Sequence, residues 1–574
     1  MRRTVWAPRA GRAELVLEDG ERLAMERGED GCFRLESPRL VPGLRYRVSL
    51  DGGPGLPDPR APHQPDGVEG ASELIDEEFA WTDAGWSAPP LREAIVYELH
   101  VGTFSPEGTF DGVVRRLDHL TDLGVNAVEL MPVAEFPGRW GWGYDGVNLY
   151  AVRAAYGGPE GLRRLVDACH RRGLAVILDT VYNHLGPAGN HLGEFGPYFT
   201  DAYRTPWGSA VNFDGPGSDG VRDFVTGNAR RWLRDFHLDG LRLDAVHAIH
   251  DETARHIVEE LAATVDALEA ELGRRLWLIL ESDRNDPRGM WPRNRGGWGA
   301  TAQWADDFHH ALHVALTGER SGYFADFRGW PDVVRALRSP HLYTGQHAAS
   351  RDRRHGREPA GTVGENFVVC LQNHDQVGNR ARGERLSRLT TPSRLRVAAL
   401  LLLTSPYVPL LFAGEEWAAS TPFLYFSDHE PELGRSVTQG RRAEFAGFGW
   451  DPAEIPDPQA ESTFIQSQLR WEERDQPAHA AMLDWYRTLT RLRRDHPGLG
   501  CGDFRLSRVI GEAGSGWVVA ERGDHLIGAN LGADPADVEA PGWAAARPLA
   551  STGDAACAGG RVRLGPESAA IWSR

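Results

Sequence analysis

Residues 239–247 read DGLRLDAVH. Leu241 and Leu243 alternate with Arg242 and Asp244, which is the two-residue period of a strand with one apolar and one charged face. On a surface strand the charged face would point into water. This segment lies in the middle of a chain of 574 residues, directly after a helix-like segment. Its charged face is therefore also a candidate for the inside of a binding site.

The segments around residues 239–247 alternate between strand-like and helix-like patterns. The other strand-like segments are residues 94–104, 125–133, 174–181, 276–282, 367–373 and 407–416. The helix-like segments are residues 113–124, 158–173, 222–237, 253–273 and 393–405. With a less legible region after residue 282, we count about eight strands, which favours a closed parallel α/β barrel over an open sheet. An open sheet would need a glycine-rich phosphate turn after its first strand, and VGTFSPEG (101–108) is a poor one.

The chain divides into three predicted parts. Residues 1–90 alternate apolar and polar side chains between Gly- and Asp-rich turns, which indicates a β-domain. Residues 91–500 form the predicted barrel, and its long aromatic and glycine-rich loop at about 185–218 is typical of a lid or a binding subdomain. Residues 501–574 return to β patterning and predict a terminal β-domain.

The composition excludes several functions. The formal net charge of −18 disfavours nucleic acid and anionic membranes as partners, because like charges repel. All 63 basic residues are arginine, so a P-loop lysine, a Schiff base and a pyridoxal phosphate linkage are excluded. The five scattered cysteines form no C-x-x-C pair, which disfavours a disulfide framework or a thiolate metal site. Without an apolar segment for a signal peptide or a membrane span, we expect a cytoplasmic protein.

Acidic side chains follow four of the predicted strands. They are Asp179, Asp244, Glu281 and Asp375. The carboxyl ends of the strands in a parallel barrel meet at one rim, so these side chains should converge. A single carboxylate at a strand end is usually a loop cap, but several near one point split their pKa values and supply an acid and a base. Glycoside hydrolysis needs such a pair, whereas a divalent cation site is the rival use.

Four stretches resemble the signature segments of the alpha-amylase family of glycoside hydrolases. They are DTVYNH (179–184), GLRLDAVH (240–247), LILES (278–282) and LQNHDQ (371–376). The resemblance covers nearly the whole chain and implies a (β/α)8 TIM barrel with an N-terminal immunoglobulin-like, carbohydrate-binding-like β-sandwich and a C-terminal β-domain. Longer stretches, such as NHDQVGNRARGERL (373–386), resemble family members that release trehalose from an α-1,4-glucan ending in a trehalosyl unit. That glucan, or a related one, is the expected substrate, with no cofactor and no catalytic metal.

The resemblance also implies roles for individual residues. Asp244 matches the nucleophile of a retaining mechanism, Glu281 the general acid/base and Asp375 the third carboxylate. Arg242 is expected to keep Asp244 ionised and oriented. The implied contacts to the sugar at the cleavage point are Tyr144, which matches an aromatic platform, together with His184 and His374, while Asp179 and Asn183 organise the site.

Two further substrate contacts are expected from chain position. Trp207 lies in the long loop after the third strand, and sugar rings stack on aromatic faces. Asp283 follows the expected acid and would face the trehalose side, although capping of its own loop is an equal alternative. For Asn285 the same two roles are expected alternatives, a contact on the trehalose side or capping of the loop.

Two alternatives remain open at this point. An α-glucan transferase of the same family, such as a branching enzyme, would share every catalytic residue and differ in the acceptor that resolves the intermediate. A catalytically inactive glucan-binding protein belongs to a different class, and the presence of all three carboxylates argues against it.

Overall fold

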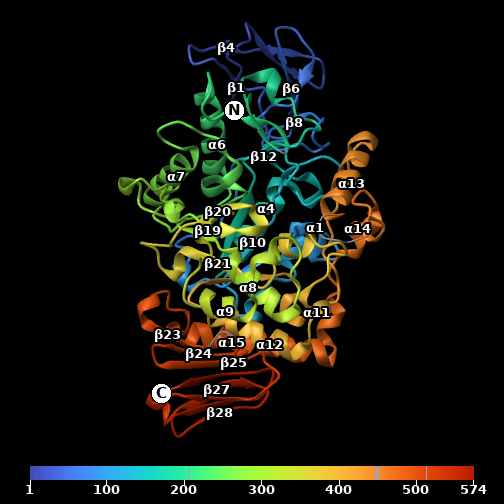
Figure 1. Cartoon of the computed structure of the whole chain (residues 1–574). Coiled ribbons are helices and arrows are strands. Elements are labelled where there is room, and N and C mark those ends of the chain that lie inside the picture. Colours follow the sequence, from blue (N-terminus) through green and yellow to red (C-terminus); the bar gives the residue numbers. More distant parts are fainter. Residues whose placement is uncertain (206, 447–450, 512–513) are drawn as a thin grey trace.

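The computed structural model describes residues 1–205, 207–446, 451–511 and 514–574. Three parts follow one another along the long axis of the molecule (Figure 1). The β-sheets of the N-terminal residues lie at one end, the barrel and its helices lie in the middle, and the C-terminal β-sheets lie at the other end. This arrangement confirms the predicted fold class of a barrel with β-structure at both ends.

Eight parallel strands close the barrel, in the order β10-β13-β16-β17-β18-β21-β22-β9. Their bounds are β9 Val96–Leu99, β10 Ala127–Leu130, β13 Ala175–Thr180, β16 Gly240–Leu243, β17 Trp277–Leu280, β18 Ala302–Trp304, β21 Phe367–Cys370 and β22 Val408–Phe412. Strand β22 pairs with β9 at Leu410–Val96 and Leu411–Tyr97, so the last strand closes on the first. Strand ends that are far apart in the sequence therefore meet at one rim.

Alternate residues of the barrel strands form two separate apolar layers. Ile177, Ile279 and Val368 belong to a cluster that fills the barrel interior. Leu241 and Leu243 of the opening stretch belong to the larger cluster between the strands and the helices. Arg242 is on the opposite, inward face of β16 and is fully buried. The charged face of this strand therefore points into the barrel.

The sixth barrel strand could not be located from the sequence. It is β18, with only three residues, and it lies in the region that follows residue 282. Such a short strand has no room for a repeated alternation, and it follows a glycine-rich turn at 296–299.

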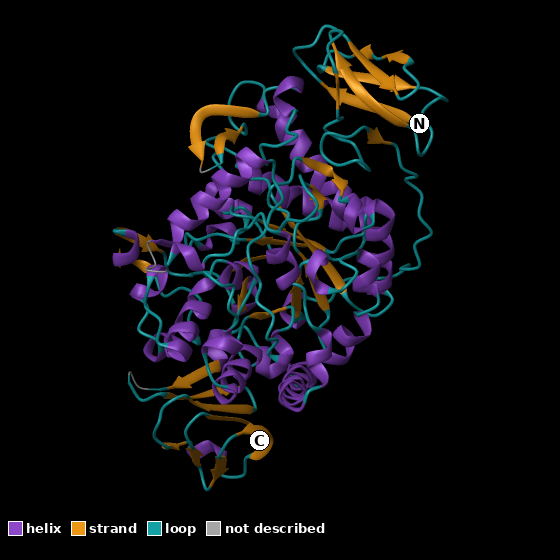
Figure 2. Cartoon of the chain, turned by 90° about the vertical axis from the view of Figure 1, so that its right-hand side faces the viewer, coloured by secondary structure: helices purple, strands orange, loops and turns teal. Residues whose placement is uncertain are grey.

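Helices surround the barrel strands (Figure 2). The longer ones are α3 Leu117–Leu123, α4 Gly158–His170, α6 Ser218–Arg230, α7 Ile257–Leu272, α8 Asp306–Thr317, α9 Trp330–Ala336, α12 Pro392–Leu403, α13 Pro431–Ala446 and α15 Pro477–Asp495. The shorter ones are α1 Val101–Phe104, α2 Phe110–Val114, α5 Leu192–Phe195, α10 His374–Gly378, α11 Leu386–Leu389 and α14 Glu461–Gln466.

The terminal parts consist of small sheets. The N-terminal strands are β1 Arg2–Trp6, β2 Ala13–Leu17, β3 Arg22–Ala24, β4 Glu26–Arg27, β5 Cys32–Glu36, β6 Arg45–Leu50, β7 Gly55–Leu56 and β8 Ser72–Glu73, in two sheets. The C-terminal strands are β23 Ser507–Ile510, β24 Trp517–Arg522, β25 His525–Asn530, β26 Ala536–Glu539, β27 Arg547–Thr552, β28 Ala555–Ala558, β29 Arg561–Leu564 and β30 Ser568–Ser573. They form a five-stranded and a three-stranded sheet.

Three two-stranded antiparallel sheets stand outside the barrel and the terminal sheets. One pairs β11 Ala134–Glu135 with β12 Asn148–Val152, and another pairs β19 Thr344–Ala348 with β20 Arg353–Gly356. The third pairs β14 Phe199–Thr205 with β15 Gly208–Val211 and lies in the segment that was predicted as a long loop. Helix α5 and this hairpin give the segment structure of its own.

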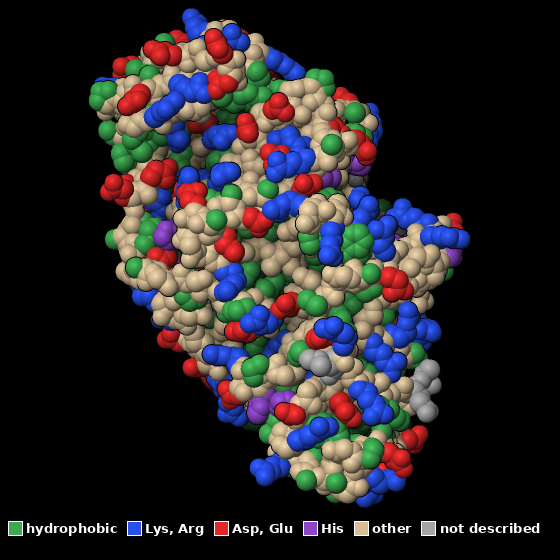
Figure 3. Space-filling model, turned by 90° about the vertical axis from the view of Figure 1, so that its left-hand side faces the viewer, with side chains coloured by type: hydrophobic (Ala, Val, Ile, Leu, Met, Phe, Trp, Pro, Cys, Tyr) green, Lys and Arg blue, Asp and Glu red, His purple; other side chains and the backbone are tan. Residues whose placement is uncertain are grey.

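The surface carries both signs of charge. On the face shown in Figure 3, arginine and acidic side chains are interspersed. Among the described residues, no helix is both long enough and apolar enough to cross a bilayer.

Candidate active site

The predicted acidic residues converge at the carboxyl ends of the barrel strands. Asp179 is the next-to-last residue of β13, Asp244 follows β16 directly, and Glu281 follows β17 directly. The backbone N–H of Asp244 donates to the carbonyl of Thr180, and that of Glu281 donates to the carbonyl of Leu243, so the strand pairing extends to these two positions. Barrel geometry thus places all three carboxylates at one rim.

Arg242 is fully buried and lies at the centre of these carboxylates. Its Nη1 donates at 2.8 Å to both carboxylate oxygens of Asp179 and at 2.8 Å to Oδ1 of Asp244. Its Nη2 lies 3.4 Å from Oε2 of Glu281. The guanidinium carbon lies 4.3 Å from the centre of the Trp304 ring. One cation therefore holds carboxylates from three neighbouring strands, which offsets part of the cost of burying them.

Glu281 has a strongly shifted acidity. Burial raises the pKa of Glu281 to about 8; the charges of Asp244 and Asp375 add to the rise, and Arg242 opposes it. The backbone N–H of Ala245 donates to Oε2 of Glu281. Ala245 has a φ of 40°, a left-handed conformation that non-glycine residues rarely adopt and that tends to occur at functional sites. At neutral pH Glu281 therefore holds a proton that it can donate.

Asp375 is the most open of the three predicted catalytic carboxylates. Its side chain is 38% exposed, against 13% for Asp244 and 18% for Glu281. It lies in the first turn of α10, and Nδ2 of Asn379 donates to its Oδ1 at 3.1 Å. His374 Nε2 lies 3.5 Å from Oδ2 of Asp375. An open carboxylate beside an imidazole is well placed to receive hydroxyl groups from a ligand.

A chain of hydrogen bonds connects Glu98 to Asp179 below the rim. Glu98 Oε1 lies 2.5 Å from Nδ1 of His374, and Glu98 Oε2 accepts from the His374 backbone N–H at 2.9 Å. His374 Nε2 lies 2.7 Å from the Tyr144 hydroxyl, which donates to Oδ2 of Asp179 at 2.6 Å. Since the Tyr144 proton points to Asp179, Nε2 of His374 must donate to the Tyr144 oxygen. His374 thus carries protons on both ring nitrogens.

The charges around His374 agree with this proton arrangement. Burial alone would lower its pKa, but Asp375 and Glu98 outweigh burial and raise the pKa of His374 to about 9. Burial also raises the pKa of Asp179, to about 6, although Arg242 opposes the rise. At neutral pH the chain therefore consists of alternating negative and positive groups with Tyr144 between them.

Trp207 and His184 form a stacked pair at the rim. Their ring centroids are 4.0 Å apart, and their planes differ by 8°. Trp207 is 49% exposed, whereas His184 is buried. Asn183 connects this pair to the acidic centre: its Nδ2 donates at 2.6 Å to Oδ2 of Asp244, and its Oδ1 lies 2.5 Å from Nδ1 of His184. The exposed face of Trp207 is therefore available to a ligand.

Asp283 and Asn285, which follow Glu281, take different positions. Asp283 accepts from Nη1 of Arg351 at 2.7 Å and lines a small polar cavity next to the rim. Other residues around this cavity are Asp306, His310, Tyr323, Tyr343 and His355. Asn285 is buried, donates to Oδ2 of Asp307 at 2.7 Å and has a φ of 50°. Both residues therefore line the cavity, Asp283 with a partly exposed side chain and Asn285 as a buried residue that holds the loop.

Three inward-facing residues were missed by the sequence analysis: Glu98, Glu129 and Trp304. Both carboxylate oxygens of Glu129 are buried without a hydrogen-bond partner among the described residues. Burial raises the pKa of Glu129 well above its usual range, and Glu98 and Asp179 add to the rise, so Glu129 is neutral. The available signal was the strand period, because Glu98 and Glu129 lie level with Ile177, on the same inward face as Asp179, in otherwise apolar strands.

In the described part of the chain, no group of three or more His, Cys, Asp and Glu side chains is arranged to hold a metal ion.

Comparison with known proteins supports the resemblance to the alpha-amylase family. The sequence profile of the alpha amylase catalytic domain matches residues 73–196, and a domain of unknown function (DUF3459) matches residues 507–571. The malto-oligosyltrehalose trehalohydrolase of Arthrobacter ramosus is 51% identical over 499 residues, which are 86% of this chain and 87% of that protein. The malto-oligosyltrehalose trehalohydrolase of Rhizobium sp. (strain M-11) is 45% identical over 584 residues, 99% of this chain and 96% of that protein.

A solved structure matches the whole chain as well. The crystal structure of a Salmonella typhimurium protein assigned as an alpha amylase has a TM-score of 0.91 and 36% identity, and covers 100% of this chain and 97% of that one. The closed barrel, its acidic rim and the catalytic-domain match define a glycosidase of the alpha-amylase family. Within that class, the chain belongs to the malto-oligosyltrehalose trehalohydrolases. The family resemblance found in the sequence is thereby confirmed.

Proposed function

We propose that this protein hydrolyses the α-1,4 bond next to the terminal trehalosyl unit of maltooligosyltrehalose and releases free trehalose. The observation that carries the proposal is the contact of one guanidinium, that of Arg242, with both Asp244 and Glu281. The guanidinium of Arg242 holds an ionised and a protonated carboxyl group next to each other, and glycoside hydrolysis requires such a pair. The names of the full-length relatives supply the substrate.

In the proposed first step, Glu281 gives its proton to the glycosidic oxygen while the bond from that oxygen to C1 breaks. Asp244 attacks C1 and forms a covalent bond to the glucan chain, and trehalose leaves with the donated proton. Arg242 stabilises the negative charge of Asp244 before the attack and orients its Oδ1. Asp375 accepts hydrogen bonds from hydroxyl groups of the distorted sugar.

In the second step, the Glu281 carboxylate takes a proton from water, and the oxygen of that water attacks C1. The bond to Asp244 breaks, Glu281 regains its proton, and the glucan leaves with its anomeric configuration retained. Both steps use only side chains and water.

The substrate contacts follow from the positions of the rim residues. The hydroxyl of Tyr144 is fixed by its bonds to His374 and Asp179, and its ring is proposed as the platform under the sugar at the cleavage point. Glu98 acts through His374 as a positioning residue, because its bonds fix the imidazole and its charge. The open face of Trp207 is proposed as a stacking surface for a further glucose unit.

The contact to the leaving trehalose is proposed for Asp283. It lies two residues beyond the acid, at the wall of the polar cavity, and its Oδ2 is held by Arg351. The Asp283 side chain is 36% exposed, so it can accept a hydrogen bond from a hydroxyl group of a second sugar.

Incubation with maltooligosyltrehalose is expected to release trehalose, detected by chromatography, and a glucan whose new reducing end is first the α anomer, detected by proton NMR. A linear malto-oligosaccharide of equal length serves as the control and should be cleaved much more slowly. If no trehalose appeared and new α-1,6 branches formed instead, the branching alternative would be correct. Initial release of the β anomer would contradict the retaining mechanism.

The pH dependence of kcat/KM is expected to show an alkaline limb near pH 8. The pKa of Glu281 is raised to about 8, so the acid is present below this pH and is lost as the pH rises through it. His374, with a pKa of about 9, loses its charge later. Initial rates measured between mildly acidic and alkaline pH test this. An alkaline limb at the ordinary carboxyl pKa of about 4.3 would contradict the assignment of Glu281 as the acid.

A further inference from the structure

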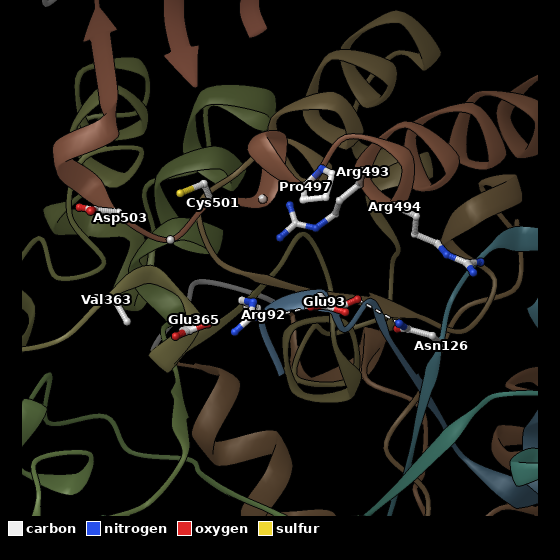
Figure 4. Close-up of a pocket in the computed structure, with 12 residues that line it drawn as sticks. Arg92, Glu93, Asn126, Val363, Glu365, Arg493, Arg494, Pro497, Cys501 and Asp503 are labelled. Atoms are coloured by element: carbon white, nitrogen blue, oxygen red, sulfur yellow. Dashed lines mark hydrogen bonds and ion pairs between the residues drawn. The ribbon is translucent and has the colours of Figure 1, made fainter. Parts of the chain in front are cut away.

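A large cavity lies between the barrel and the C-terminal residues, with a volume of about 530 Å³. Figure 4 shows the residues that line it. They are Arg92, Glu93, Asn126, Val363, Glu365, Arg493, Arg494, Pro497, Gly500, Cys501, Gly502 and Asp503. The volume falls within the range of about 300–1,000 Å³ that is typical of small-molecule sites.

The cavity lies at the other end of the barrel from the acidic rim. Residues 91–93 precede β9, Asn126 precedes β10, and Glu365 precedes β21, so the lining comes from the amino ends of these strands. The residues proposed for catalysis follow the carboxyl ends. The cavity is therefore a separate site.

The buried arginines of the described chain differ in their partners. Five form an ion pair within 4 Å: Arg153, Arg163, Arg222, Arg231 and Arg242. Arg385 has three glutamates near enough to affect its pKa. The two others, Arg493 and Arg522, have neither an ion pair within 4 Å nor a carboxylate that affects their pKa in the described part of the chain. A buried charge normally needs a partner of opposite sign. The two exceptions lie next to each other and next to this cavity.

Arg493 reaches from the end of α15 into the cavity (Figure 4). Its Nη1 donates to the carbonyls of Leu403 and Ser405, and its Nη2 donates to the carbonyl of Tyr407. The bond to Leu403 caps the last residue of α12, whose dipole supplies about half a negative charge, and the other two bonds reach the loop between α12 and β22. Together the three bonds use three of the five N–H donors of the guanidinium, which leaves two for a ligand.

Arg522 adds a second positive charge. It is 1% exposed, donates from Nη1 to Oγ of Ser507 at 2.7 Å, and has no partner for Nη2 among the described residues. Burial, together with the charge of Arg522, lowers the pKa of Arg493 to about 9. Arg522 lies close enough to Cys501, a lining residue, for the two groups to interact electrostatically. The half charge of one helix end cannot balance both guanidinium groups.

The acidic lining residues are engaged elsewhere or lie on the opposite wall. Asp503 is bound in bidentate fashion by Arg505, and Glu93 pairs with Arg92 at 3.2 Å. Figure 4 places the Arg92 side chain between Glu93 and Glu365, across the cavity from Arg493. Arg494, on the same helix as Arg493, has no carboxylate within 4 Å in the described residues. Positive charge is thus in excess on the α15 side.

We propose that this cavity binds a small molecule with a phosphate group, and that the phosphate lies on the Arg493 and Arg494 side. Phosphate oxygens match the planar donor pattern of guanidinium groups. The remaining volume accommodates an attached polar group such as a sugar, which can reach Asn126 and the Glu365 wall.

Calorimetric titration of the full chain with inorganic phosphate and with glucose 6-phosphate, at constant ionic strength, tests the proposal. Both ligands should bind saturably. Arg494→Gln is expected to weaken binding by about tenfold or more, because it removes an exposed guanidinium without disturbing the α12 cap. Glu365→Gln is expected to tighten binding, because it removes the unpaired acidic charge from the opposite wall.

Arg491→Gln is the matched control, since Arg491 is an exposed arginine of the same helix that does not line the cavity. It should leave the affinity unchanged. The proposal is overturned if the unmodified chain shows no saturable binding, or if Arg494→Gln and Arg491→Gln change the affinity equally. Tighter binding of glucose 6-phosphate than of phosphate identifies a phosphate ester as the ligand, and equal binding identifies free phosphate.

Discussion

Asp244→Asn is expected to lower kcat/KM for maltooligosyltrehalose by at least about 10⁴-fold, which corresponds to about 5.5 kcal/mol of lost transition-state stabilisation. The amide cannot form the covalent bond to C1, and it no longer balances the charge of Arg242. The loss should be equally large for a substrate with an activated leaving group, such as a 4-nitrophenyl α-maltooligoside, because attack at C1 fails in both cases. Initial rates with both substrates measure this.

Asp219→Asn is the matched control for this change. Asp219 is an exposed aspartate of α6 that makes none of the rim contacts described above, so the same change of charge leaves those contacts intact. Its activity should be unchanged. Circular dichroism and the thermal midpoint should show that the Asp244 variant keeps the fold. Retention of most of the activity in folded Asp244→Asn would rule out Asp244 as the nucleophile.

Glu281→Gln is expected to lower kcat for maltooligosyltrehalose by about 10³- to 10⁴-fold, at the upper end of what general acid catalysis contributes. Glutamine keeps the size of the side chain and can still accept from the Ala245 N–H, but it has no proton to give. The alkaline limb near pH 8 should disappear in the residual activity, because the titrating group is gone.

A substrate with an activated leaving group distinguishes Glu281→Gln from Asp244→Asn. A 4-nitrophenolate needs little protonation, so the first step with the activated substrate should be slowed far less in Glu281→Gln than with the natural bond. Pre-steady-state release of nitrophenol measures that step. Glu271→Gln, an exposed glutamate of α7, is the control. An equal loss with both substrates would show that Glu281 is not the acid.

Much of the barrel could be predicted from local sequence patterns. Seven of its strands show an apolar alternation or an apolar run, and their order along the chain fixes their order around the barrel. The remaining strand, β18, has only three residues, too few for any period to be recognised. The hairpin of β14 and β15 was likewise read as a loop, because β14 has no buried residue and neither strand has a regular alternation of apolar side chains.

The candidate site could be predicted in part for the same reason. Asp244 and Arg242 occupy one face of a single strand, so their proximity follows from a period of two residues. The bond between Glu98 and His374 joins residues that are 276 positions apart. The barrel closes between β22 and β9, and only that closure brings the two elements together. No local pattern records such a contact.

The sequence by itself determined the strands, the inward face of each one and the acidic residues at their ends, because these properties depend on neighbouring residues. The tertiary structure alone decided the charge states of these side chains and their ion-pair and hydrogen-bond partners. Burial keeps Glu281 protonated, Glu98 and Asp375 keep His374 charged, and Arg242 holds three carboxylates at once. The same holds at the opposite end, where only the fold places Arg493 and Arg522 beside a cavity while leaving both guanidinium groups without a carboxylate within 4 Å in the described part of the chain. Electrostatic energies depend on distance and on burial, and both are set when the barrel closes.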